Sequence, residues 1–402
     1  MTERLYYRDS FLREFPATVL EVVPGNRAGI VLDRTAFYPT SGGQLFDTGT
    51  LLSDKGTARV VEVAEDDGGR ILHFIEGDEL PSGTQVRGEI DGARRHDHIE
   101  QHSGQHVLSA AFLRLFGLET ISFHMGDESC SIDLSTSTLD AHEIGDAETL
   151  ANDIVLEDRP VEIHFVSRAE AQRLGLRKIP PAERDELRLI DIRDFDLTAC
   201  GGTHVIRTGQ IGAILLRKTE KVKQGWRVEF VCGNRAVRTA RRDFRTLTEA
   251  AGLVSGHIWE LPQQIAKLQG SAKTLRKSQA DLLEEVASYH ANQLLHDTPE
   301  HNGHKVRVAV FPDRDLEYVK LLAQRFVRQG NAVCFFASTS ATPAVVFAQS
   351  AGQPHHMGAL MKEALASLGG RGGGSKDLAQ GGPERIDFLD RVLEALAARV
   401  RE

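Results

Sequence analysis

The sequence predicts a multidomain α+β protein with an N-terminal β-barrel, an α/β domain, a helical spacer and a C-terminal α/β domain. Short apolar and polar alternations fill the first ninety residues, a seven-residue apolar repeat follows residue 261, and strand-like and helix-like segments alternate after residue 304. The chain has 402 residues, enough for two to four domains that each bury a core. We place the four domains at 1–90, 91–235, 236–300 and 301–402.

The first ninety residues alternate apolar and polar side chains as β-strands do, over 17–23, 58–63 and 71–75. Glycine-containing turn signals separate these segments, which favours a small β-barrel. The same region contains Gly42, Gly43 and Gln44 after a proline and a serine. Adjacent glycines let the backbone approach a ligand or a neighbouring domain closely, although a tight β-turn explains them equally well.

Two motifs about a hundred residues apart each place two metal-capable side chains four positions apart. In HSGQH, His102 and His106 precede an apolar run with helical spacing that stops at Gly117, so we expect both on one helix face. In CGGTH, Cys200 and His204 flank a glycine turn after a predicted strand over 187–196. Together they form the nitrogen and sulfur set that zinc prefers. We predict one zinc ion per chain, with a structural or a working role.

The charge pattern leaves two interpretations open. The net charge of −9 does not suggest a nucleic-acid binder, but residues 217–245 carry ten basic side chains and three acidic ones. This basic segment is either a phosphate-binding surface or a solvated helix face that acidic residues elsewhere balance.

The segment from about 236 to 296 is expected to be mostly helical. An apolar residue recurs every seven positions from Leu261 to Tyr289, with a companion row that two glutamines interrupt, Gln279 and Gln293. A coiled coil between two chains and a helix packed on its own chain both fit this pattern. We favour a helical spacer, and it or the C-terminal domain is our candidate contact for a homodimer.

The last hundred residues predict an α/β domain. Strands are expected over 306–311, 332–337 and 344–348, and helices over 316–328, 357–368 and 384–401. A glycine-rich stretch over 369–382 lies between the last two helices and is neither a Walker A motif nor a Rossmann fingerprint. We expect an exposed loop whose backbone N–H groups bind phosphate or nucleic acid, rather than a flexible linker. Its candidate contacts are Arg371, Gly372, Gly373, Gly374 and Lys376.

Several absences bear on the compartment. The first ten residues lack the apolar core of a signal peptide, and no run reaches the roughly 18 apolar residues of a membrane span. The four cysteines have no disulfide-framework spacing. We therefore expect a cytoplasmic protein with no membrane partner.

The four motifs, FYPTSGGQ, HSGQH, CGGTH and GGRGGGSKDLAQGG, occur in an order that resembles the alanyl-tRNA editing proteins, which are free-standing relatives of the editing domain of alanyl-tRNA synthetase. The last motif resembles the C-terminal DHHA1-type domain of the longer members. Residues 227–236 also resemble the family's RxxFVxGxRA segment, with Cys232 at the variable position. Because the chain begins at the β-domain, we expect an editor that acts in trans, not a synthetase.

The resemblance implies a zinc-dependent aminoacyl-tRNA deacylase. It would hydrolyse the ester between tRNA(Ala) and a wrong amino acid, chiefly serine and then glycine, while the C-terminal domain holds the outer part of the tRNA. Ser103 would sense the serine side chain, His124 would line the pocket, and Asp196 would support a metal ligand. The segment Gly42, Gly43 and Gln44 would lie near that pocket.

Three rival interpretations remain from the residues alone. A non-enzymatic RNA-binding protein with a structural zinc suits the basic segment and the glycine-rich stretch. Another zinc hydrolase is disfavoured because HExxH is absent, and a phosphodiesterase is disfavoured because the aspartate-rich DHH metal motifs are absent.

Overall fold

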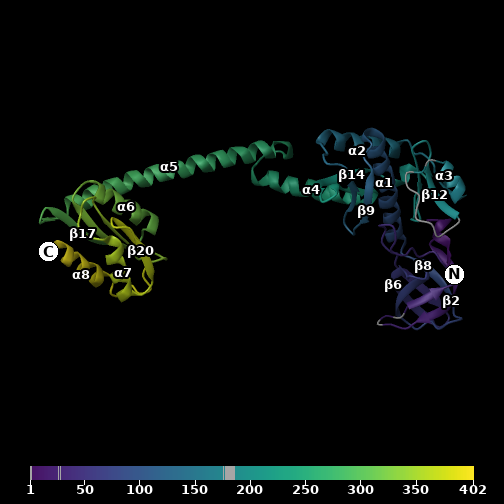
Figure 1. The fold of residues 1–402 in the computed structure, drawn as a ribbon, viewed down its shortest axis with the longest axis horizontal. Helices are drawn as coiled ribbons and strands as arrows, with labels where there is room; N and C mark the ends of the chain where they lie inside the picture. Colours follow the sequence, from purple (N-terminus) through teal and green to yellow (C-terminus); the bar gives the residue numbers. More distant parts are fainter. Residues whose placement is uncertain (1, 26, 28, 175, 177–185) are drawn as a thin grey trace. The chain divides into compact units, whose positions relative to one another are not determined.

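The computed structural model describes residues 2–25, 27, 29–174, 176 and 186–402. The chain forms two compact units, Met1–Glu249 and Ala250–Glu402 (Figure 1). Helices and sheets in both units confirm the predicted multidomain α+β architecture. Among the helices of the described residues, none combines the length and the apolar character that a bilayer crossing requires.

A closed six-stranded barrel opens the first unit, as predicted. Its core includes Val19, Val60 and Ile71 from the alternating segments that the sequence predicts as strands, together with Ile30 and Leu51 from other strands. Outside the barrel, β1 (Glu3–Arg4) pairs with β4 (Arg34–Thr35), and η1 (Leu5–Tyr7) follows β1. The barrel strands, in their order around it, are β2 (Glu14–Val23), β3 (Gly29–Leu32), β7 (Ile71–Gly77), β6 (Gly56–Glu65), β5 (Gly49–Ser53) and β8 (Gln85–Ile90).

The central helix α1 (Gly92–Phe116) follows the barrel directly. The Asp91 side chain caps it by accepting from the backbone N–H groups of Ala93 and Arg94, and Gly117 ends it in the left-handed conformation, as the sequence predicts. Every residue of α1 from His98 to Phe112 is buried. A helix that is buried on all sides carries polar side chains only where they have a partner or a function.

Two sheets and a second helix surround α1. One sheet has the order β14-β15-β10-β9, and the other has the order β11-β12-β13. The prediction of one strand over 187–196 is wrong beyond Ile192, where the observed strand ends. Asp194 adopts a positive φ there, and the chain turns into a new strand. The elements are β9 (Thr120–Met125), β10 (Cys130–Leu134), α2 (Ala141–Leu156), β11 (Val161–Ser167), α3 (Arg168–Arg173), β12 (Glu186–Ile192), β13 (Asp196–Ala199), η2 (Thr208–Ile211), β14 (Ile214–Val222) and β15 (Gly225–Cys232).

A buried ion pair joins the barrel to α1. The Arg95 guanidinium pairs with Asp47 and donates to the carbonyl oxygens of Ser10 at 2.8 Å and Ala36 at 2.5 Å. Both charged side chains are almost fully buried. Removal of either partner would leave an uncompensated buried charge, so the barrel and α1 are held together as one body.

The helical segment that the sequence predicts after residue 236 is present as α4 (Gly233–Leu253), η3 (Ile258–Glu260) and α5 (Leu261–His296). In the second unit, the end of α5 packs on α6 (Leu316–Arg328) through Ala287, Ala291 and Leu294. Residues 265–286 of α5 are exposed throughout.

A six-stranded sheet with the order β16-β17-β18-β19-β21-β20 forms the core of the second unit. Helices α5 and α6 cover one face, and α7 and α8 cover the other. The predicted strands and helices are confirmed, except that the last helix starts at Leu389 rather than at 384. The remaining elements are β16 (Glu300–His301), β17 (His304–Phe311), β18 (Ala332–Ser338), β19 (Ala344–Gln349), α7 (Met357–Leu368), β20 (Arg371–Gly374), β21 (Leu378–Gly382) and α8 (Leu389–Arg401).

The glycine-rich stretch corrects one prediction. We expected an exposed loop over 369–382, but β20 and β21 form an antiparallel hairpin at the edge of this sheet. The glycines Gly372 and Gly381 are paired across the hairpin, and the Leu365 side chain of α7 lies against both. Small residues are therefore required here by the packing of α7 on the two strands.

Candidate metal centre

The structure brings the four predicted ligands together. Their donor atoms, from His102, His106, Cys200 and His204, all lie within 4.8 Å of one another. The Cys200 sulfur is 3.5 Å from Nε2 of His102 and 3.4 Å from Nε2 of His204. The two histidines of α1 lie one helical turn apart, with ring centroids 5.2 Å apart and nearly parallel rings.

The CGGTH loop reaches the helix because its glycines leave room for the ligands. A Cβ atom added to Gly202 would lie 2.0 Å from Cε1 of His102, so no larger residue fits there without moving the ring. The backbone N–H of His204 donates to the Ser10 hydroxyl at 3.0 Å, which holds the far end of the loop against the barrel. The loop is therefore fixed on both sides of the cluster.

The cluster fits a metal ion chemically. Both ring nitrogens of His106 are buried and lack a hydrogen-bond partner among the described residues. A buried imidazole without a partner is unfavourable unless something else binds it. A metal ion would satisfy this ring, and three imidazoles with one thiol are a donor set that suits zinc.

The charges around the cluster also favour a cation. Burial raises the pKa of the Cys200 thiol, but the neighbouring His102 and His204 outweigh burial and hold this pKa well below its usual value. Burial lowers the pKa of His106, yet Asp196 and Cys200 together raise it to about 9. Both shifts show that Asp196 and the Cys200 thiolate place negative charge around the ligands, which a metal cation would balance.

Gln44 links the barrel to both halves of the cluster. Its Oε1 atom is 2.7 Å from Nδ1 of His102 and accepts from the Thr203 backbone N–H at 3.1 Å. Its amide nitrogen donates to the Thr203 hydroxyl at 2.9 Å. His102 therefore donates through Nδ1, which leaves Nε2 with a free lone pair facing Cys200.

The two glycines before Gln44, Gly42 and Gly43, form a tight turn that also lies against β9. Both have positive φ, and Ser41 and Gln44 exchange backbone hydrogen bonds around them. The Gly43 carbonyl accepts from the Met125 backbone N–H at 3.0 Å. The structure therefore contains both the turn and the close backbone approach that the sequence left open.

Ser103 is buried beside His102, and its hydroxyl oxygen accepts from the Val205 backbone N–H at 3.0 Å. It therefore ties the helix to the residue that follows CGGTH, while its own hydrogen can still donate. The Asp196 carboxylate lies 3.8 Å from Nδ1 of His106.

His124 is exposed on β9, whereas its neighbour Phe123 stacks on the ring of His102, with centroids 5.4 Å apart. Successive side chains of a strand point to opposite faces. Phe123 therefore faces the cluster, and the structure does not bring His124 to it.

Arg188 is a buried residue beside the cluster that sequence reasoning missed. Its guanidinium donates to the Tyr7 carbonyl at 2.8 Å and to the Cys200 carbonyl at 2.6 Å. Its remaining nitrogen, Nη2, has no hydrogen-bond partner among the described residues. The available signal was a charged residue between two leucines of the strand ELRLIDI.

The C-terminal candidates lie in the second unit. Arg371 and Gly374 belong to β20, and Lys376 lies in the turn of the hairpin. The side chains of Arg371 and Lys376 are exposed, so both are accessible to a ligand.

Three stretches of the chain match known protein families. Residues 7–94 match the family described as tRNA synthetases class II (A). Residues 187–229, which include the CGGTH loop, match the threonyl and alanyl tRNA synthetase second additional domain. Residues 306–402 match the DHHA1 domain.

The chain is also similar to longer stretches of curated relatives. It is 31% identical over 409 residues to the alanyl-tRNA editing protein AlaX-L of Pyrococcus horikoshii, with 100% of both chains covered. It is 33% identical over 409 residues to the alanine–tRNA ligase of Archaeoglobus fulgidus, with 98% of this chain and 44% of the ligase covered. The chain thus spans less than half of that ligase.

Among solved structures, the C-Ala domain of Aquifex aeolicus alanyl-tRNA synthetase is 23% identical, with 26% of this chain and 99% of that chain covered. Its TM-score of 0.25 is too low to bear on the fold.

Proposed function

Because the chain belongs to the family of alanyl-tRNA editing proteins, we propose that it hydrolyses the ester between tRNA(Ala) and a wrongly attached serine or glycine. We propose further that the four clustered ligands hold one zinc ion for this reaction. The observation that supports the metal is the meeting of three histidines and a cysteine around His106, whose two ring nitrogens are buried without a hydrogen-bond partner among the described residues.

The residues around the cluster have distinct tasks in this proposal. Bound zinc would supply a Lewis acid that polarises the ester carbonyl or lowers the pKa of a water molecule to about 7. Gln44 keeps His102 in the tautomer that presents Nε2, and Arg188 fixes the peptide that carries Cys200. Asp196 lies 3.8 Å from Nδ1 of His106 and would orient this ring as a ligand. Phe123 supplies an apolar wall beside His102, which limits the access of water.

Ser103 is our proposed sensor of the wrong amino acid. Serine exceeds alanine by one hydroxyl, and a site that hydrogen-bonds this hydroxyl rejects the substrate that lacks it. The Ser103 hydroxyl accepts from Val205 and retains a hydrogen to donate, and it lies beside a ligand. We expect Ser103→Val to slow release of serine more than release of glycine, whereas Ser103→Thr keeps the preference. Equal effects on both substrates with full zinc content would contradict the sensing role.

Deacylation assays with Ser-, Gly- and Ala-tRNA(Ala), with and without a chelator, test the whole proposal. We expect release of serine and glycine but little release of alanine, and loss of activity when zinc is removed. Cys200→Ala and His106→Ala should lose most bound zinc, as measured by mass spectrometry, together with most activity. Full activity in metal-free protein would exclude the zinc mechanism.

One observation favours a second candidate, a non-enzymatic RNA-binding protein with a structural zinc. Four protein ligands are typical of closed structural sites, whereas catalytic zinc usually keeps an open position. The same assay separates the two candidates, because the structural alternative predicts tRNA binding without release of any amino acid.

We also propose that tRNA contacts the C-terminal hairpin and that the protein works in the cytoplasm. The exposed Arg371 and Lys376 can reach phosphates, and the space beside Gly373 is open, so a nucleic-acid backbone can approach the hairpin there. All four cysteines are free, which suits a reducing compartment.

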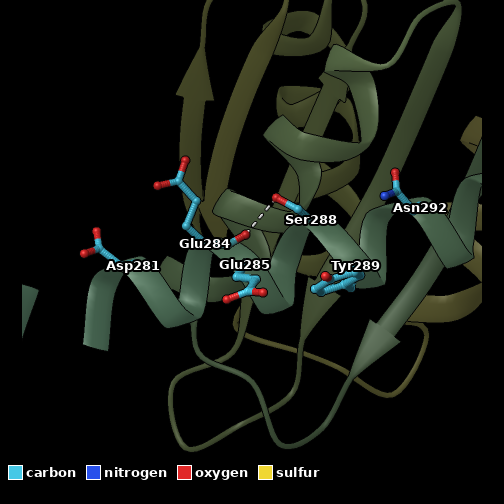
Figure 2. A pocket seen from close by; sticks show the side chains of 6 residues that line it. All are labelled: Asp281, Glu284, Glu285, Ser288, Tyr289 and Asn292. Carbon is cyan, nitrogen blue, oxygen red and sulfur yellow. Dashed lines mark hydrogen bonds between the residues drawn. The ribbon is translucent and has the colours of Figure 1, made fainter. Parts of the chain in front are cut away.

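Helix α5 supports a homodimer. Its exposed stretch carries large apolar side chains at heptad positions, among them Leu268, Leu275 and Leu282, which are 55%, 70% and 61% exposed. A hollow of about 420 Å³ lies along this helix. Its six lining residues, among them Glu285 and Tyr289, all come from α5, and Figure 2 shows their side chains. A hollow lined by one helix is an open face. A helix in water is stabilised mainly by packing of its apolar face. We therefore propose that a second copy of α5 covers the row of exposed leucines.

A further inference from the structure

Four arginines form one stripe along α4. Arg238, Arg241, Arg242 and Arg245 stand at positions i, i+3, i+4 and i+7 of this helix, so they share one face. All four side chains are exposed. They line a hollow of about 530 Å³, which Asp127 and Glu128 also line. We call these four residues the arginine stripe.

The stripe is poorly neutralised. Arg238 lies 4.0 Å from Asp97, which Arg235 already holds, and Arg242 lies 3.8 Å from the highly exposed Glu128. Exposed pairs at such distances contribute little energy. Among the described residues, Arg241 and Arg245 have no carboxylate within ion-pair distance. This local excess of positive charge stands out in a chain whose net charge is −9.

The stripe is fixed to the helix that bears two metal ligands. Arg235, at the start of α4, donates to Asp97 of α1 at 2.8 Å and to the Gly126 carbonyl at 2.6 Å. Asp97 precedes His102 by five residues, which is about 7.5 Å along the helix axis. The Gln101 side chain also exchanges hydrogen bonds with the Cys232 backbone just before α4. The stripe and the metal cluster therefore belong to one rigid part of the first unit.

We infer that the arginine stripe binds the phosphate backbone of an RNA whose end enters the metal centre. This inference rests on the proposed function, which supplies an RNA substrate. The stripe extends about 10 Å along α4, and one nucleic-acid strand carries a phosphate about every 3.4 Å of its axis, so about three phosphates can face it. Guanidinium groups bind phosphate oxygens in pairs, which favours arginine over lysine here.

Binding of uncharged tRNA(Ala) tests this inference without any need for hydrolysis. Fluorescence anisotropy over a series of salt concentrations would compare the full chain with Arg241→Gln/Arg245→Gln. We expect the affinity of this variant to fall on the order of tenfold at 0.1 M salt, and the slope of log K against log salt to fall by one to two, about 0.9 for each lost phosphate contact. Deacylation at saturating tRNA should keep its kcat.

A matched control removes two arginines elsewhere. Arg27→Gln/Arg59→Gln changes the net charge equally on the exposed barrel surface, where both side chains pair with glutamates, and should leave the slope unchanged. Arg241→Lys/Arg245→Lys should keep most of the slope because the charge remains. Unchanged affinity and slope in the glutamine variant would overturn the inference, even if the protein releases serine from tRNA normally.

Two further outcomes separate the inference from the proposed function. If tRNA binding depends on the arginine stripe but no amino acid is released, the proposed function is wrong. The inference that the stripe binds RNA is then still supported. If the glutamine variant instead changes only the oligomeric state in sedimentation, the stripe binds an acidic protein surface, and our inference is wrong.

Discussion

At the scale of single residues, the four candidate metal ligands are oriented by neighbours that belong to other parts of the chain. Gln44 of the barrel region contacts His102 on α1 and Thr203 in the CGGTH loop. Arg188 of β12 holds the Cys200 carbonyl. Such outer contacts fix ring orientation, and their removal typically lowers metal affinity about 10–100-fold.

Gln44→Met tests this support directly. The methionine keeps the length of the side chain but has no oxygen to accept a hydrogen bond from Nδ1 of His102. The His102 ring therefore loses the contact that fixes its tautomer. We expect zinc affinity to fall about 10–100-fold while the fold is retained. Competition with a chromophoric chelator measures this affinity. Gln85→Met is the control, because the Gln85 side chain donates to the Thr18 hydroxyl on the barrel surface. Equal affinities of the two variants would contradict the role of Gln44.

The sequence predicts the ligands of this site better than their surroundings. The spacing of His102, His106, Cys200 and His204 predicts their meeting, because each pair needs only one helical turn or one glycine turn to converge. Phe123 could not be distinguished from His124, since a one-position shift along a strand exchanges the inner and outer faces. Arg188 was missed because burial of a charged side chain depends on tertiary contacts that no local pattern records.

At the scale of elements, α1 depends on close packing against β15. A Cβ atom added to Gly104 would lie 2.2 Å from the Cys232 sulfur. We expect Gly104→Ala to destabilise the protein by about 1–3 kcal/mol through overpacking, despite the better helix propensity of alanine. Urea denaturation measures this change.

Two further variants make the Gly104 prediction specific. Cys232→Ala should partly rescue Gly104→Ala, so the free energies of the two changes should not add. Gly145→Ala in α2 meets no atom within 4 Å and should be neutral or slightly stabilising. Strict additivity of the first pair would show that the contact with the Cys232 sulfur is not the cause.

The barrel contains a buried histidine that should make its stability depend on pH. His73 is completely buried between Thr35 and the Ile30 carbonyl, and burial lowers its pKa from 6.5 to about 4. The folded state therefore favours the neutral ring. The contribution of the neutral ring to the free energy of unfolding is complete above pH 6.5 and is lost as the pH falls toward 4.

His73→Gln measures this contribution. Between pH 7 and pH 4.5 the free energy of unfolding should fall about 2.5 kcal/mol less in His73→Gln than in the native protein, because the variant has no ring to protonate. Urea titrations at the two pH values give the difference. His142→Gln, at a site that is 81% exposed, should behave as the native protein does; an equal loss in all three proteins would rule out His73 as the cause.

Most elements could be predicted from the sequence because their patterns are strong. The capped helix α1 and the alternating barrel strands are examples. The hairpin of β20 and β21 was missed because glycines have no side chain to show alternation, so a paired strand resembles a loop. The turn at Asp194 was missed because a single positive φ at aspartate leaves no periodic signal.

At the scale of the whole molecule, the chain consists of two compact units, and α5 belongs to the second. The four-domain division stays a prediction, although the barrel and α1 are joined by the buried pair of Arg95 and Asp47. The heptad row of α5 predicts self-association. We expect Leu275→Glu/Leu282→Glu to convert a dimer into a monomer in sedimentation velocity, because four carboxylates would then face one another across the seam.

A control and a contrary result complete this prediction. Lys273→Glu/Lys277→Glu adds negative charge to the same exposed stretch outside the heptad rows and should leave the dimer in place. A native protein that sediments as a monomer over the micromolar range would exclude α5 as a stable dimer contact.

The bonds that Gln44 makes to both His102 and Thr203 have a consequence for the order of assembly during synthesis. The barrel strands are complete by Ile90, so the barrel can form before most of the chain has been synthesised. The two histidines of α1 emerge next, but the cysteine and the last histidine follow about a hundred residues later. A nascent chain therefore carries an incomplete set of candidate ligands over about a quarter of its length, and we expect firm metal binding only after the CGGTH loop has joined the two histidines of α1.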